Sequence, residues 1–286
     1  MDETFVYLNG KFIPRSQATI DIEDRGFMFA DGVYELTHFY GGRPFAMAPH
    51  LARLGRSLKA MELAPPMEVE HLGQISAELV RRNNCPDAGV YWQITRGPAP
   101  RNHAFPKHVT PTVLVMTYPI KPMKHPSPVA TIRAITAPDI HWHYPCYKTL
   151  MLLGNVLAKE HAHQAGADEA ILHRDGKVTE GSSTNVIVIH DGVLRTHPAD
   201  QWILEGVTRG AVLECARELD IRISEEALVL PALFSADEVF ITGSTTEIAA
   251  VTHVDGRPIG GGKAGPVVQR LFDAFLCKVA KECGLD

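Results

Sequence analysis

The stretch Tyr118–Pro128 reads YPIKPMKHPSP, and it decides how the 286-residue chain is divided. Proline stands at positions 119, 122, 126 and 128. Because proline fixes φ and removes a backbone donor, this run suits an extended connector better than a helix or a strand. We therefore predict an N-terminal domain at residues 1–120, a linker at 121–128 and a C-terminal domain at 129–286.

Upstream of the linker, apolar periodicity and turn signals predict an α/β domain. Asn9-Gly10 interrupts the alternating run FVYLNGKFIP and predicts a β-hairpin, since both central residues of a type I′ turn need positive φ. Apolar residues recur on one helical face from Leu51 to Met61 and from Val69 to Leu79. Further strands are expected at 32–40, 89–96 and 111–118.

Downstream of the linker, β-hairpins outnumber βαβ units. Asp-Gly pairs at 175–176, 191–192 and 255–256 predict three hairpin turns. A strand is expected at 129–137, and helices at about 149–165, 208–219 and 266–281. The predicted fold class is therefore mixed α/β (α+β), with a smaller N-terminal α/β domain and a larger, β-rich C-terminal α/β domain.

Composition is that of a soluble enzyme. Hydrophobic residues make up 45% of the chain, enough for a large core, and the formal net charge of -5 argues against a nucleic-acid binder. No apolar run approaches the roughly 20 residues that span a bilayer, and MDETFVYLNG lacks the pattern of a signal peptide. Five scattered cysteines favour reduced thiols. We expect a cytoplasmic protein with neither nucleic acid nor membrane as a partner.

Two kinds of motif are misleading. The run Gly260–Gly265 matches G-x-G-x-x-G, but only one expected helix follows, so we interpret it as a turn and not as a nucleotide loop. His161 and His163 would point to different faces of a helix. No acid or cysteine completes a ligand set around His141 and His143, so we expect no metal site.

The remaining polar motifs contain candidate catalytic residues. Amino-group transfer on pyridoxal phosphate, for example, needs a lysine, an acid against the pyridine nitrogen, a phosphate cradle and a carboxylate trap. Lys148 lies in the apolar run WHYPCYKTLMLLGN, which favours a neutral, nucleophilic amine. Glu180 precedes Gly181 and three hydroxyl residues, which suggests close approach by a flat ligand. Taken singly, each is better explained as an ordinary residue: a lysine snorkelling at a helix start and a solvated glutamate at a strand end.

Candidate anion sites follow the same reasoning. Gly206–Arg209 opens an expected helix, whose N-terminal amides attract phosphate, although Thr208 could simply cap that helix. Gly243–Thr246 could add amides and hydroxyls, and Arg53 could add a cation. The loop Arg96–His103 offers two arginines and a histidine to a carboxylate, or is a solvated basic loop.

Together and in this order, the motifs resemble the fold-type IV pyridoxal-phosphate enzymes over almost the whole chain. The resemblance implies a two-domain fold with the active site between the domains. The segments that carry it are DRGFMFADGVYE (24–35), TRGPAPRNHAFP (95–106), VTEGSSTN (178–185), GVTR (206–209) and GSTTEI (243–248).

Within that group, the sequence is most similar to the D-amino acid aminotransferases. This resemblance implies transfer of an amino group from a D-amino acid such as D-alanine to a 2-oxo acid such as 2-oxoglutarate, by a ping-pong mechanism through pyridoxamine phosphate. Branched-chain and (R)-amine aminotransferases and aminodeoxychorismate lyase remain alternatives within the group. From other classes, a ligand-binding protein or an oxidoreductase using the Gly260–Gly265 loop also remains.

The resemblance also implies residue roles. Lys148 would carry the cofactor as a Schiff base, and Glu180 would face the pyridine nitrogen. Tyr34, Arg101 and His103 would form the carboxylate trap, with the loop residues supplied by the other subunit of a homodimer with shared active sites. The remaining cofactor contacts would be Arg53, Leu204 beside the ring, Val207, Thr208, Ser244 and Thr245.

Two positions depart from the family pattern and leave specificity open. His38 stands where the family usually has lysine, four residues after the trap tyrosine, and where branched-chain enzymes have arginine. Gly243 stands where a family serine belongs in the phosphate loop, so Ser244 and Thr245 would carry that end. His103, two residues after Arg101, favours a transaminase over the lyase.

Overall fold

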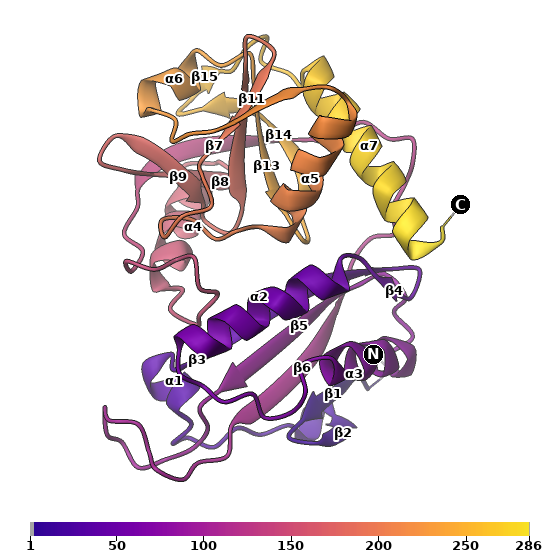
Figure 1. Cartoon of the computed structure of the whole chain (residues 1–286), viewed down its shortest axis with the longest axis vertical. Helices are drawn as coiled ribbons and strands as arrows, with labels where there is room; N and C mark the ends of the chain where they lie inside the picture. Colours follow the sequence, from indigo (N-terminus) through magenta and orange to yellow (C-terminus); the bar gives the residue numbers. More distant parts are fainter. Residues whose placement is uncertain (1–2, 286) are drawn as a thin grey trace. The chain divides into compact units, whose positions relative to one another are not determined.

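The computed structural model describes residues 3–285, and its chain separates into two compact units (Figure 1). Unit 1 contains the chain up to Met123, the segment Tyr147–Met151 and the chain from Lys281 onward. Unit 2 contains Lys124–Cys146 and Leu152–Ala280. Helices and strands occur in both units, which confirms the predicted mixed α/β class.

The described strands of unit 1 form a six-stranded antiparallel sheet in the order β2-β1-β6-β5-β3-β4. The predicted hairpin forms at Asn9-Gly10, where φ is 47° and 91°. The predicted strands lie within one residue of their expected ends. The strands are β1 (Phe5–Leu8), β2 (Lys11–Pro14), β3 (Gly32–Tyr40), β4 (Arg43–Pro44), β5 (Ala88–Thr95) and β6 (Thr112–Pro119).

The helices of residues 3–285 that lie wholly in unit 1 are α1 (Arg25–Phe29), α2 (Met47–Ala60) and α3 (His71–Arg82). The apolar faces predicted for α2 and α3 are buried in one core that includes Trp92 of β5. Burying each large apolar side chain contributes about 1.5–3 kcal/mol to stability. Both longer helices therefore form where the apolar spacing predicts them.

The described strands of unit 2 form a nine-stranded mixed sheet in the order β12-β11-β10-β13-β14-β7-β8-β9, with β15 paired to β14. All three predicted Asp-Gly turns form, and both residues of each turn have positive φ. The strands are β7 (Ala130–Pro138), β8 (Glu169–Arg174), β9 (Lys177–Gly181), β10 (Asn185–His190), β11 (Val193–Thr196), β12 (Arg222–Glu225), β13 (Glu238–Gly243), β14 (Glu247–Val254) and β15 (Arg257–Pro258).

The α-helices α4 (Leu153–Gln164), α5 (Val207–Glu218) and α6 (Leu230–Phe234) belong to unit 2, and α7 (Pro266–Cys283) begins there. The run Gly260–Gly265 forms the predicted turn before α7.

The predicted start of the 149–165 helix is wrong, because α4 begins at Leu153. The segment before it pairs with β3 instead: the Tyr34 N–H donates to the Lys148 carbonyl at 3.0 Å, and the Leu150 N–H donates to the Gly32 carbonyl at 3.1 Å. Backbone groups bonded to a strand cannot also make helical hydrogen bonds. Lys148 therefore lies in extended chain, five residues before the helix.

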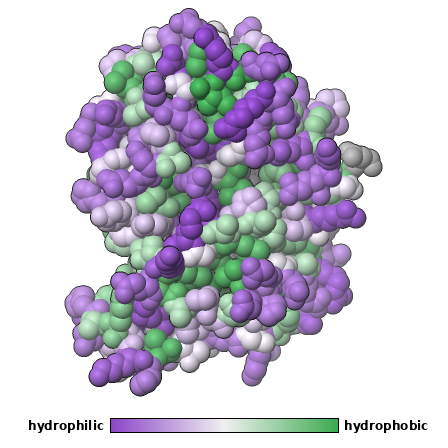
Figure 2. All heavy atoms as spheres, in the orientation of Figure 1, coloured by the Kyte–Doolittle hydropathy of each residue, from purple (hydrophilic) through white to green (hydrophobic). Residues whose placement is uncertain are grey.

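No helix among residues 3–285 is long and apolar enough to cross a membrane. On the face drawn in Figure 2, hydrophilic side chains cover most of the surface, with smaller hydrophobic areas between them. The long helix α7 keeps its apolar residues inward, with Val268, Leu271 and Val279 fully buried.

Candidate active site

Lys148 and Tyr34 lie next to each other in unit 1. The Lys148 Nζ atom lies 4.2 Å from the centroid of the Tyr34 ring, a cation–π distance. The Lys148 backbone N–H donates to Ser57 Oγ of α2 at 3.0 Å, so its position is fixed by main-chain bonds to both α2 and β3. The lysine and the tyrosine singled out by sequence thus share one place in the fold.

Arg53 is buried on α2 and is held by Glu35 of β3. Arg53 Nε donates to Glu35 Oε1 at 2.6 Å, and Nη2 donates to Oε2 at 2.9 Å. His50 Nδ1 lies 2.9 Å from Oε2 of the same carboxylate. Burial by itself would raise the pKa of Glu35, but Arg53 and His50 together hold that pKa far below its usual range. Glu35 and His50, which sequence reasoning missed, therefore fix the guanidinium of Arg53.

Glu35→Gln should destabilise the protein strongly. The amide is neutral, so the buried Arg53 would lose the ionised carboxylate that holds it, and the free energy of unfolding should fall by about 3 kcal/mol. Urea unfolding at neutral pH measures this change. Glu78→Gln is the matched control, because Glu78 pairs with Arg81 and Arg82 at the surface and its replacement should alter stability little. Equal losses in the two variants would contradict the assigned role of Glu35.

Arg101 and His103 are exposed on the loop between β5 and β6, and both lie beside Phe29. The Arg101 guanidinium is 5.2 Å from the Phe29 ring centroid, and the His103 ring centroid is 5.3 Å from it. Arg96, the other arginine of this loop, is buried and donates to the carbonyls of Met61 and Glu62 at 2.8 and 2.9 Å. Arg96 is therefore committed to the protein backbone, whereas Arg101 is accessible.

His38, the first departure from the family pattern, is buried in β3. Its ring stacks on Tyr40 with centroids 3.7 Å apart and an angle of 19° between the ring planes. Side chains two apart on a strand point to the same face, so this stacking follows from the strand geometry.

Glu180 lies on β9 in unit 2 and is buried among polar groups. Its Oε2 accepts a hydrogen bond from the Leu204 N–H at 2.9 Å, so the two residues expected beside the pyridine ring are adjacent. Its Oε1 lies 3.6 Å from Nδ1 of the buried His141, which is in turn 3.4 Å from Asp139 Oδ1. Burial lowers the pKa of His141, while Asp139 opposes that shift.

Asp139 and His141 form a polar cluster next to Glu180, and sequence reasoning missed this cluster. Asp139 stands only two residues before His141 and accepts hydrogen bonds from Arg174 Nη2 and Thr179 Oγ1, both at 3.0 Å. The short spacing between Asp139 and His141 was the signal in the sequence that could have revealed this cluster. Among the described residues, no group of three or more His, Cys, Asp and Glu side chains is arranged to hold a metal ion.

Two of the three hydroxyl residues after Glu180 form hydrogen bonds within the protein. Ser182 Oγ donates to Glu169 of β8, and Thr184 Oγ1 donates to the same carboxylate at 3.1 Å. Asn155 of α4 donates to the Ser182 carbonyl at 2.7 Å. Glu169 therefore binds the hydroxyls of Ser182 and Thr184, and the close approach of a flat ligand to this segment stays a prediction.

The N-terminus of α5 has no side-chain cap. Gly206 is the N-cap residue, so the alternative that Thr208 caps this helix is wrong. Asn185 Nδ2 donates to the Leu204 carbonyl at 2.8 Å and fixes the chain just before the helix. A Cβ atom at Gly206 would lie 2.0 Å from Asn185 Oδ1, so glycine is required there. The amides of Val207 and Thr208 thus stand at a helix terminus suited to an anion.

Ser244 and Thr245 lie in the turn between β13 and β14. The segment that leads into α5 is attached to the same sheet. Asn185 pairs with Thr242 across β10 and β13, and Asn185 also holds Leu204. At Gly243, a Cβ atom would make only ordinary contacts of 3.5 Å and longer. The absence of the family serine at this position is therefore not forced by packing.

Comparison with known proteins decides the family. The family model described as amino-transferase class IV matches residues 32–254. The chain is a class IV aminotransferase. The resemblance to fold-type IV enzymes that the sequence motifs indicated is therefore confirmed.

Known proteins are similar to nearly the whole length of this class IV aminotransferase. D-alanine aminotransferase of Listeria monocytogenes is 42% identical over 282 residues, covering 98% of this chain and 97% of its own. D-alanine aminotransferase of Bacillus licheniformis is 42% identical over 278 residues, covering 97% of this chain and 98% of its own. The branched-chain amino acid aminotransferase of Escherichia coli has a similar structure, with a TM-score of 0.90 at 26% identity over 98% of this chain and 96% of its own.

Proposed function

We propose that this class IV aminotransferase transfers amino groups between D-amino acids, such as D-alanine, and 2-oxo acids, such as 2-oxoglutarate, with pyridoxal 5′-phosphate as cofactor. The observation that carries the proposal is the 42% identity with D-alanine aminotransferases over 98% of the chain. Two solved branched-chain aminotransferases share the fold, each with a TM-score of 0.90, but at only 26% and 27% identity.

The residues present fit the parts of pyridoxal phosphate. The buried carboxylate of Glu180 suits a protonated ring nitrogen, and the peptide N–H of Leu204 holds that carboxylate in place. The uncapped start of α5 suits the phosphate, with Ser244, Thr245 and Arg53 as further phosphate contacts. When bound, this cofactor supplies an electron-withdrawing ring that stabilises negative charge at the substrate Cα.

Each side chain then has a chemical task. Lys148 would hold the cofactor through its amine. The same amine, once free, would accept and return the proton of the substrate Cα. Glu180 holds the proton at the pyridine nitrogen. Tyr34, Arg101 and His103 bind the substrate carboxylate, the arginine through two parallel hydrogen bonds.

A stereochemical assay tests the proposed substrate class. D-alanine and L-alanine are each supplied with 2-oxoglutarate, and pyruvate formation is followed. We expect a preference for D-alanine of at least about 100-fold in kcat/KM, equivalent to roughly 2.7 kcal/mol of transition-state discrimination. A preference for L-alanine would place the enzyme with the branched-chain aminotransferases. Release of pyruvate from aminodeoxychorismate without any 2-oxo acid would identify the lyase.

Arg101→Ala should weaken the use of D-alanine by roughly 30- to 800-fold in kcat/KM, because a charge-assisted bidentate contact is lost. An (R)-amine without a carboxylate offers nothing for this arginine to bind and should be converted at an unchanged rate. Lys107→Ala removes another exposed cation of the same loop and serves as the control. An equal loss for both substrates would exclude Arg101 from the carboxylate trap.

We infer further that the enzyme works as a homodimer in which the loop of one subunit completes the site of the other. Large apolar side chains are exposed beside that loop: Ile22 at 81% and Phe27 at 78%. Exposed apolar groups of this kind favour an interface. Mixing inactive Lys148→Ala and Arg101→Ala chains should then restore activity, because one site per heterodimer has both residues. No recovery in a mixture shown to exchange subunits would refute the shared site.

A further inference from the structure

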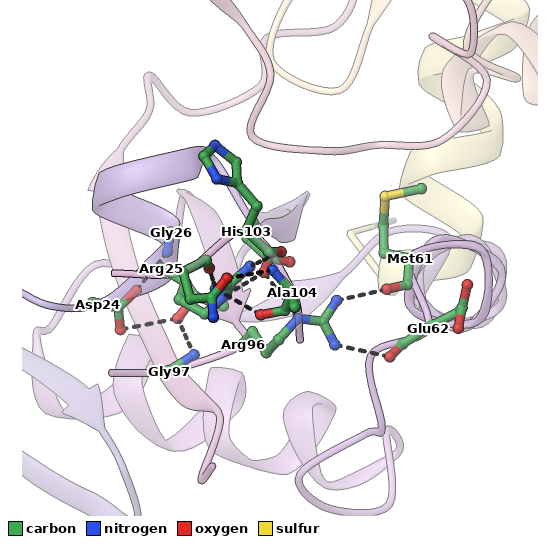
Figure 3. A network of polar contacts seen from close by, with 12 residues as sticks. Asp24, Arg25, Gly26, Met61, Glu62, Arg96, Gly97, His103 and Ala104 are labelled. Atoms are coloured by element: carbon green, nitrogen blue, oxygen red, sulfur yellow. Dashed lines mark hydrogen bonds and ion pairs between the residues drawn. The ribbon is translucent and has the colours of Figure 1, made fainter. Parts of the chain in front are cut away.

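The short helix α1 lies against the loop that carries Arg101 and His103 (Figure 3). Its first residue, Arg25, is buried and points its guanidinium at three consecutive backbone carbonyls of this loop. Nη1 donates to the carbonyls of Asn102 and Ala104, the latter at 3.5 Å, and Nη2 donates to that of His103 at 3.3 Å. The DRGFMF segment contributes to the family resemblance, yet none of the roles described so far uses it.

Arg25 is itself anchored by a shared carboxylate. Asp31 Oδ2 accepts from Arg25 Nε at 2.7 Å and from Arg96 Nε at 2.9 Å. Arg96 also lies over the Phe105 ring, 3.6 Å from its centroid, at the far end of the loop. Partial burial would raise the pKa of Asp31, but the two arginines lower it overall, so the carboxylate stays ionised between them.

Asp24, the residue before α1, fixes the position of this helix. This N-cap residue accepts from the Gly26 N–H at 2.8 Å, and its other oxygen accepts from Thr95 Oγ1 at 3.0 Å and Thr112 Oγ1 at 2.6 Å. A Cβ atom at Gly26 would lie 2.2 Å from Thr95 Cγ2, so helix and strand approach as closely as glycine allows. The helix is therefore attached to β5 and β6, the two strands that the loop connects.

Phe29, one turn after Arg25 on the same face of α1, touches the side chains of the loop. Its ring centroid lies 4.9 Å from the Arg25 guanidinium and 5.2 Å from that of Arg101. The His103 ring is 5.3 Å away. One residue of α1 thus contacts the loop backbone and the other contacts its two functional side chains.

We propose that α1 positions the carboxylate trap, with Arg25 fixing the backbone of Asn102–Ala104 and Phe29 fixing the side chains of Arg101 and His103. This inference rests on the proposed function, in which that pair binds the substrate carboxylate. An exposed loop would otherwise lose conformational entropy each time substrate binds, and prior ordering reduces that cost. Arginine is required because its planar fork donates several hydrogen bonds at once, which the single ammonium of lysine cannot reproduce.

Arg25→Lys keeps the positive charge beside Asp31 but removes the fork that spans the three carbonyls. We expect KM for D-alanine to rise roughly tenfold, with kcat within about twofold of wild type. In the cofactor-loaded enzyme without substrate, hydrogen exchange at the amides of residues 101–105 should accelerate about tenfold. The exchange measurement reports loop order without reference to catalysis.

Two further variants make the test specific. Arg82→Lys is the matched control, because Arg82 also pairs with a carboxylate, Glu78, and lies over a ring, Phe12, but has no contact with the loop. It should match wild type in both measurements. Phe29→Leu leaves the Arg25–Asp31 pair intact and should raise KM about threefold, so it decides the matter even if Arg25→Lys does not fold.

The outcomes separate this inference from the proposed function. If Arg101→Ala raises KM while Phe29→Leu and Arg25→Lys behave as wild type in KM and loop exchange, the trap stands and α1 has no positioning role. If Arg101→Ala leaves KM unchanged, the proposed trap is wrong, and the exchange data alone show whether α1 orders the loop. A fall in kcat at constant KM in Arg25→Lys would also overturn the inference.

Discussion

Lys148→Ala should abolish transamination, by at least about 10,000-fold in kcat, and should leave no cofactor that borohydride can trap on the protein. In the proposed function the amine of Lys148 holds the cofactor and moves the proton, and alanine can do neither. The fold should persist, because the backbone of Lys148 and not its side chain makes the hydrogen bonds to Tyr34 and Ser57. Mass spectrometry after reduction, together with circular dichroism, checks both expectations.

Lys59→Ala is the matched control for this variant. Lys59 is exposed on α2 in the same unit, and its replacement should leave activity and trapped cofactor unchanged. If Lys148→Ala still showed reduced cofactor bound to another lysine, the assignment of Lys148 would be wrong.

Glu180→Gln should retain the cofactor but reduce kcat on the order of 1,000-fold. The glutamine carbonyl can still accept the hydrogen bond from the Leu204 N–H, so the local structure should be preserved. A neutral amide, however, cannot stabilise a positive charge at the pyridine nitrogen. Steady-state kinetics and the amount of cofactor per chain separate the loss of turnover from a loss of binding.

Glu226→Gln, an exposed acid in the same unit, should behave as wild type. Turnover of Glu180→Gln within a few-fold of the unmodified enzyme would refute the role given to Glu180. A preparation of Glu180→Gln without cofactor would mean instead that this carboxylate serves binding more than turnover.

Sequence reasoning predicted best those elements whose cause is local. The hairpin at Asn9-Gly10 forms because these two residues tolerate positive φ, whatever the rest of the chain does. The buried faces of α2 and α3 follow from apolar residues that recur every three or four positions. In both cases, a few neighbouring residues contain the whole physical reason.

The segment around Lys148 could not be predicted in the same way. Residues 149–152 continue the apolar pattern of the following helix, yet the backbone of Lys148 and Leu150 is hydrogen-bonded to β3, more than a hundred residues earlier in the sequence. Helical periodicity cannot reveal a partner strand that competes for the same N–H and C=O groups. A long-range hydrogen bond therefore decided the local structure.

Long-range contacts also limited how much of the candidate active site could be predicted from the sequence. Motifs gave the residue types that pyridoxal-phosphate chemistry needs, but they could not tell an accessible arginine from a structural one. Arg96 and Arg101 stand five positions apart, and only the structure reveals that Met61 and Glu62 occupy the first. Likewise, the commitment of Ser182 and Thr184 depends on Glu169, a buried acid on another strand.

The route of the chain through the two units has a consequence for biosynthesis. Unit 1 begins at the N-terminus, but it includes residues from Lys281 onward, where the Glu282 carboxylate accepts from the Ala46 N–H at 2.8 Å and Cys283 Sγ donates to the Arg43 carbonyl. Domains usually fold as units while they emerge from the ribosome. Here unit 1 stays incomplete until Lys281 and the residues after it, which follow unit 2 in the sequence, have been translated. A stop codon just before Lys281 would spare every proposed site residue and still leave the start of α2 without its partner.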